Sequence, residues 1–173
     1  DEDGFYAIKS EGIQGKFLNG KKIWFEYFSA LTMTKESVSE LILPSIGGVQ
    51  AEYKKMFYLD KKLILFTTVS DESQGRKFLY VQYVDPNGTI KNKPKKVGEI
   101  PFTNFPEDNF EFELIENDSK IAIQYHNSFQ TYNEEPFTYN ILNTNLQSEI
   151  SEELKLPLVG KKFKLVKTRI GNS

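Results

Sequence analysis

Short apolar segments of six to eight residues, separated by polar turns, recur along the whole chain. They are rich in Val, Ile, Leu, Phe and Tyr, and most of these residue types favour the pleated, half-buried surface of a β-strand. The segments are residues 5–10, 23–28, 63–70, 78–84, 121–127 and 137–142. The pattern predicts an all-β protein.

Three prolines mark a repeat in this pattern. Pro44, Pro101 and Pro157 each follow an apolar stretch and are 57 and 56 residues apart. Two strand-like segments precede each proline at nearly constant spacing, and one more strand-like segment follows it. A fixed period of this length is typical of a repeat architecture. We therefore expect one β-repeat domain over residues 1–173, with the following parts: repeats at 5–44, 53–101 and 110–157, and a closing strand at 163–170.

Turn residues between the segments favour antiparallel hairpins. In "VDPNGT" (84–89), Pro86 presets φ and Gly88 accepts a positive φ. In the matching place, "LNTNLQ" (142–147), asparagines tolerate the left-handed region. The stretch 31–43 has a competing interpretation, because its apolar residues have nearly helical spacing and Thr34 is a possible cap. The repeat favours a hairpin there.

An antiparallel four-stranded unit repeated at this pitch predicts β-propeller blades. The first unit lacks the first of its four strands, and the last unit consists of this first strand alone. A propeller ring closes in this way when one blade is built from strands of both chain termini. Three blades are too few for a propeller of about four to eight blades. We therefore expect either a longer chain or a homodimer that forms a six-bladed ring. A β-sandwich is the alternative architecture.

Composition excludes several functional classes. With 22 basic and 24 acidic residues the net charge is −2, so no overall field attracts nucleic acid. The chain has no cysteine, which excludes disulfides and thiolate chemistry, and no apolar run approaches the roughly 20 residues that span a bilayer. It opens with Asp1, and we expect a processed protein, an expression fragment or a piece of a longer chain.

Three stretches carry a resemblance to a known group of proteins. They are "YLDKKLILFTTVSD", "LYVQYVDPNGTIKNKPKKVGEIP" and "NFEFELIENDSKIAIQYHNSFQTYNEEPFTYNILNTNLQSE". Over residues 53–158 the chain resembles uncharacterised secreted or envelope-associated β-propeller-like repeat proteins of the Bacteroidota. The resemblance implies export to the periplasm, the cell surface or the medium, and a binding or scaffold role. It transfers no site residues.

No pattern predicts a catalytic centre, a metal site or a cofactor. His126 is the only histidine, and it has no nucleophile elbow nearby. Glu111 and Glu113 are two residues apart on a predicted strand, where they form its polar face. The acidic turns lack the spacing of an EF-hand loop. The lysines of 91–96 suit the protection of an edge strand better than a polyanion site.

One loop is a candidate binding site. Tyr125, His126, Phe129 and Tyr132 lie in "YHNSFQTYNEEPF" (125–137), where rigid aromatic side chains suit a protein or a carbohydrate. The alternative is that these rings fill the space between blades. We expect a non-catalytic binding or scaffold module of the cell envelope. The alternative function is a glycan-active hydrolase or lyase fragment with its site where the blades converge.

Overall fold

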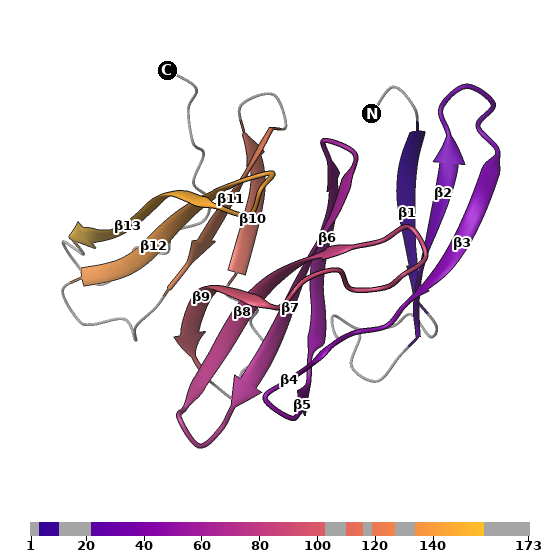
Figure 1. Ribbon diagram of the computed structural model, residues 1–173. Helices are drawn as coiled ribbons and strands as arrows, with labels where there is room; N and C mark the ends of the chain where they lie inside the picture. Colours follow the sequence, from indigo (N-terminus) through magenta and orange to yellow (C-terminus); the bar gives the residue numbers. More distant parts are fainter. Residues whose placement is uncertain (1–3, 11–21, 103–109, 116–118, 127–133, 158–173) are drawn as a thin grey trace. The chain divides into compact units, whose positions relative to one another are not determined.

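The computed structural model describes residues 4–10, 22–102, 110–115, 119–126 and 134–157 (Figure 1). Within these residues the chain consists of β-strands and turns and contains no helix. The all-β prediction is therefore confirmed.

Three larger sheets contain most of the strands, and each follows the order of the sequence (Figure 1). The first sheet consists of β1 (Gly4–Ser10), β2 (Ile23–Ser29) and β3 (Lys35–Leu41). The second consists of β6 (Glu52–Leu59), β7 (Lys62–Asp71), β8 (Arg76–Val84) and β9 (Lys95–Pro101). The third consists of β10 (Phe110–Ile115), β11 (Lys120–Tyr125), β12 (Glu134–Asn143) and β13 (Ser148–Pro157). A two-stranded hairpin, β4 (Ser45–Ile46) with β5 (Val49–Gln50), connects the first two sheets along the sequence.

Antiparallel pairing of sequence neighbours is thus confirmed, and the helical interpretation of 31–43 is wrong. Lys35–Leu41 is strand β3 and pairs antiparallel with β2. Apolar residues at helical spacing cannot distinguish a helix from a strand in so short a segment. The edge of β2 decides that this segment is a strand, because it supplies backbone pairing to β3 at all but a bulge near Lys35.

The chain divides into two compact units. Unit 1 comprises residues 1–69 and 79–96, and unit 2 comprises residues 70–78 and 97–173. The division passes through the second sheet, so β7, β8 and β9 contribute to both units. Meanders of this kind occur in blades and in other antiparallel architectures, and the ring arrangement stays a prediction.

The core of unit 1 lies between the first and second sheets. Ile23, Phe25 and Leu41 from the first sheet form one buried cluster with Met56, Leu63, Leu65 and Val84 from the second. The rings of Tyr6 and Tyr58 meet edge to face, with centroids 4.8 Å apart. Side chains of a strand alternate between two faces. The side chains on one face of the first sheet therefore pack in this core.

A turn of the second sheet lies against strand β3. Gly88 has a φ of 89°, and a Cβ atom at this position would overlap the Glu40 carbonyl oxygen. The Gly88 N–H donates to the Asp85 carbonyl at 2.8 Å, which closes the turn. The prediction that Gly88 accepts a positive φ is confirmed, and the close approach is a second reason for glycine there.

Unit 2 joins the third sheet to the C-terminal half of β9. Gly98 of β9 has no side chain, so the rings of Phe110 and Tyr125 approach its backbone closely. The buried Asn140 amide donates to the Val97 carbonyl at 2.8 Å and its oxygen accepts from the Ser148 hydroxyl at 2.7 Å. These contacts satisfy polar groups that would be costly to bury alone.

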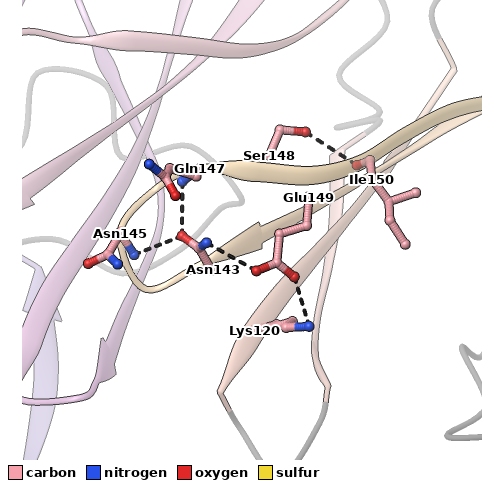
Figure 2. Close-up of polar contacts among 7 residues, drawn as sticks. All are labelled: Lys120, Asn143, Asn145, Gln147, Ser148, Glu149 and Ile150. Carbon is pink, nitrogen blue, oxygen red and sulfur yellow. Dashed lines mark hydrogen bonds and ion pairs between the residues drawn. The ribbon is translucent and has the colours of Figure 1, made fainter.

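The side chain of Asn143 adds to the backbone hydrogen bonds that close the turn between β12 and β13 (Figure 2). The side-chain amide oxygen (Oδ1) of Asn143 accepts hydrogen bonds from the backbone N–H groups of Asn145 and Gln147 at 2.9 and 3.1 Å. The residue with a positive φ is Leu146, at 59°, and not an asparagine. The asparagines of this turn do not take the left-handed conformation, which is taken by Leu146, whose side chain is buried.

Candidate functional site

Of the four residues expected to bind a partner, the structure describes two, Tyr125 and His126. Tyr125 ends β11 and is buried, with its ring centroid 5.4 Å from that of Phe110. Burial raises the pKa of its phenol, and the nearby Glu99 charge adds to this effect. In unit 2 the Tyr125 ring therefore contributes to internal packing.

His126 follows directly and is half-buried, with its ring 6.3 Å from the ring of Phe137. Phe129 and Tyr132 lie outside the described residues. The use of this loop for binding stays a prediction.

Side chains that could hold a metal ion do not gather in the described part of the chain. There, no three His, Asp or Glu side chains lie close enough to hold a metal ion. Glu111 and Glu113 are both exposed on β10, as expected for the polar face of a strand. Within the same residues no helix could span a bilayer.

The first sheet presents a second face, opposite the core of unit 1. The registers of β1, β2 and β3 align its residues in three rows. The rows are Lys9, Trp24 and Glu40; Ala7, Glu26 and Val38; and Phe5, Phe28 and Lys35. We call these nine residues the outer face of the first sheet.

Aromatic and apolar groups occupy much of this outer face. The rings of Phe5 and Phe28 stack in parallel, with centroids 5.2 Å apart. Phe5 is 44 % exposed and Val38 is 50 % exposed. The Lys35 ammonium lies 3.4 Å from the Glu26 carboxylate. This ion pair is exposed enough to contribute little to stability.

The loop between β2 and β3 lies at one end of the first sheet (Figure 1) and carries two further exposed apolar side chains. Leu31 is 93 % exposed and Met33 is 68 % exposed. Single exposed apolar residues are common, but a contiguous group of them often marks an interaction site. We call Phe5, Phe28, Leu31 and Met33 the tip surface.

Hydrogen bonds hold the loop in one conformation. The Met33 N–H donates to the Ser29 carbonyl at 2.9 Å, and the Ser29 N–H donates to the Thr34 carbonyl at 3.0 Å. The hydroxyls of Thr32 and Thr34 are 2.6 Å apart and bond to each other. Met33 has a φ of 54°, which is unusual for a residue with a Cβ. Strained backbone of this kind clusters at functional sites.

Sequence reasoning missed the tip surface because it treated Leu31 as part of an apolar periodicity. A usable signal was present in "SALTMT" (29–34), where two large apolar residues occur between strands. Loops between strands are usually polar and rich in Gly, Asn, Asp or Pro.

Comparisons of the chain with protein-family models, with curated proteins and with solved structures found no match.

Proposed function

We propose that the protein is a non-catalytic binding module that docks the tip surface into an apolar recess of a partner protein. The observation that carries the proposal is the exposure of Leu31 and Met33 on a hydrogen-bonded turn. A loop that is ordered before binding loses less conformational entropy when a partner covers it. The tip surface is therefore suited to act as an anchor.

The chemistry of the tip surface favours a protein over a carbohydrate. Leu31 and Met33 offer no hydrogen-bonding group apart from the weakly accepting thioether. The hydroxyls of Thr32 and Thr34 already bond to each other. Full burial of the two apolar side chains would contribute about 3–6 kcal/mol, a substantial part of the roughly 8 kcal/mol of a micromolar interaction.

The wider setting of this module is also part of the proposal. The repeat of antiparallel meanders supports an assembly of propeller blades, and the resemblance to envelope proteins of the Bacteroidota supports an exported location. Fold by itself does not determine function, so the tip surface remains the basis for the binding role.

The test uses a displayed random-peptide library and a panel of soluble polysaccharides as probes for the intact chain. We expect enriched peptides to be apolar and to bind with micromolar Kd when resynthesised. Leu31→Lys combined with Met33→Lys should weaken binding at least tenfold. Val49→Lys is the matched control, because Val49 is an exposed apolar residue of another hairpin in unit 1.

Two results would contradict the proposal. One is binding to a polysaccharide without any peptide enrichment. The other is peptide binding that the tip variants leave unchanged while circular dichroism shows them to be folded.

A further inference from the structure

The turn that follows β8 contains an asparagine–glycine pair, Asn87 and Gly88, which has a chemistry of its own. Asn87 is exposed, and Gly88 has no side chain to shield the peptide nitrogen that joins the two residues. In such a pair this nitrogen can attack the side-chain amide carbon of the asparagine, and asparagine is for this reason a thermolabile residue. The reaction needs only water and solvent base.

The chemical change has two steps. The Gly88 nitrogen gives its proton to solvent base and bonds to the Asn87 Cγ atom, while the side-chain nitrogen takes up a proton from water and leaves as ammonia. Water then opens the resulting succinimide ring at either of its two carbonyl groups. One opening gives aspartate. The other gives isoaspartate, in which the backbone runs through the side chain and is longer by a methylene group. Nothing is oxidised or reduced.

Hydrogen bonds in the folded turn oppose the first step. The Gly88 N–H donates to the Asp85 carbonyl at 2.8 Å, and the Asn87 side-chain oxygen accepts the Thr89 N–H at 3.1 Å. The Gly88 nitrogen must lose its proton before it attacks, and the hydrogen bond to Asp85 retains that proton. The closed turn therefore slows the reaction.

Strand β3 holds this turn closed. The Ser39 hydroxyl donates to the Pro86 carbonyl at 2.5 Å. The Gly88 backbone lies so close to the Glu40 carbonyl that even a Cβ atom would overlap it. All these residues belong to unit 1. The turn therefore opens fully only when it leaves β3, and a turn with a longer backbone has no room to return.

We propose that Asn87 is a site of spontaneous isoaspartate formation, gated by the contact between this turn and β3. A reaction of a transiently open form proceeds at a rate set by the population of that form. The extent of conversion therefore increases with the time that unit 1 spends with this contact open. After conversion the turn stays detached from β3. This inference uses neither the tip surface nor a binding partner.

The turn between β12 and β13 offers a matched comparison within the same chain. Leu146 donates its N–H to the Asn143 carbonyl at 2.9 Å and has a positive φ, as Gly88 does in the other turn. Asn145 therefore corresponds to Asn87. The residue after Asn145 is leucine, whose side chain hinders attack by the peptide nitrogen. We expect conversion at Asn87 and none at Asn145 over the same period.

Incubation of the intact chain at mildly alkaline pH, with and without unfolding concentrations of urea, measures the gate. Trypsin releases residues 78–91 as one peptide, in which tandem mass spectrometry follows Asn87. We expect conversion to be at least tenfold faster in urea than in the folded chain. Ser39→Ala should speed conversion of the folded chain roughly fivefold, as expected for the loss of one hydrogen bond, and should leave the rate in urea unchanged. Ser37→Ala, on the same strand, is the matched control and should change neither rate.

The converted chain tests whether the turn stays detached. Ion exchange separates it from the unreacted chain because conversion adds a negative charge, and enzymatic methylation specific for isoaspartate measures the share of that product. Urea unfolding should show that the isoaspartate-containing chain is less stable than the unreacted one. Asn87→Asp carries the same charge on an ordinary backbone and should match the unreacted chain.

Four results would overturn the proposal. One is the absence of conversion at Asn87 in urea. Another is an equal rate in the folded and unfolded chains, which would show that the turn gives no protection. A folded-state rate that Ser39→Ala leaves unchanged would show that the contact with β3 is not the gate. Equal stability of the isoaspartate-containing chain and Asn87→Asp would show that the turn accepts the longer backbone.

Discussion

Two hairpin turns in unit 1 use the same backbone conformation with different residues. Gly47 and Gly48 have φ values of 62° and 84°, and Asp60 and Lys61 have values of 48° and 57°. Both pairs form two-residue loops between paired strand ends, Ile46 with Val49 and Leu59 with Lys62. Two consecutive left-handed residues are easy for glycine and unfavourable for residues with a Cβ.

Lys61→Gly should therefore stabilise the protein by roughly 0.5–1 kcal/mol, because it removes left-handed strain. Urea unfolding followed by circular dichroism measures the change. The reverse substitution, Gly48→Lys, should destabilise by a similar amount. A Cβ at Gly48 would meet no atom within 4 Å, so strain is the only cost there. A loss of stability in Lys61→Gly would contradict this account.

Tyr53 makes the protein sensitive to alkaline pH. Burial raises the pKa of its phenol to about 12, although a hydrogen bond with the Met56 backbone acts in the opposite direction. In the unfolded chain the phenol ionises near 10. Since the folded state retains the proton more strongly, this contribution to stability is complete below about pH 10 and decreases as pH rises towards 12.

We expect the free energy of unfolding to fall by on the order of 3 kcal/mol between pH 10 and pH 12. Tyr53→Phe has no phenol to ionise and should lose distinctly less over the same interval. Absorbance at 295 nm reports the ionisation of the tyrosines directly. Equal pH dependence in the two proteins would show that Tyr53 is not responsible.

The sequence predicted which polar residues form turns, but it predicted less well which residue of each turn takes the positive φ. Gly88 takes the positive φ expected of it. Asn143 stabilises its turn through its side-chain oxygen, while Leu146 takes the left-handed conformation. The Glu149 carboxylate bonds the Lys120 ammonium at 2.7 Å and the Asn143 amide at 3.1 Å (Figure 2). These two hydrogen bonds hold the pKa of Glu149 below its usual range, and the one from Lys120 has the larger effect.

At the scale of elements, β9 is a strand whose backbone is packed directly against aromatic rings. In unit 2 a Cβ at Gly98 would lie 3.1 Å from ring atoms of both Phe110 and Tyr125. Contacts this short force the neighbours to move. Overpacking of a buried site usually costs about 1–3 kcal/mol.

Gly98→Val should therefore destabilise the chain by about that amount, and Gly98→Ala should cost less. Chemical denaturation measures both changes. Gly75→Ala is a useful comparison, because Gly75 has open space around it and its φ of 62° makes strain the only cost. An unchanged midpoint for Gly98→Val would show that the two rings can shift freely.

The segment 31–43 shows why element type can be misjudged. Its apolar residues match a helical period, yet Lys35–Leu41 forms a strand. Local propensity is a weak influence when a neighbouring strand offers a complete set of backbone partners. The repeat gave the better prediction because it uses information from the whole chain.

At the scale of the whole molecule, the chain divides into two compact units, and the boundary between them passes through strands β7, β8 and β9 of the second sheet.

The amino-acid sequence by itself determined the positions of most strands and their hairpin order. Alternation of apolar and polar residues, turn residues and short connections are local properties, so they can be read without knowing the partner of each strand. Only the tertiary structure decided which faces are buried. Tyr125 packs inside unit 2, while Leu31 and Met33 remain in water. Burial depends on contacts between residues far apart in the chain, which no local pattern specifies.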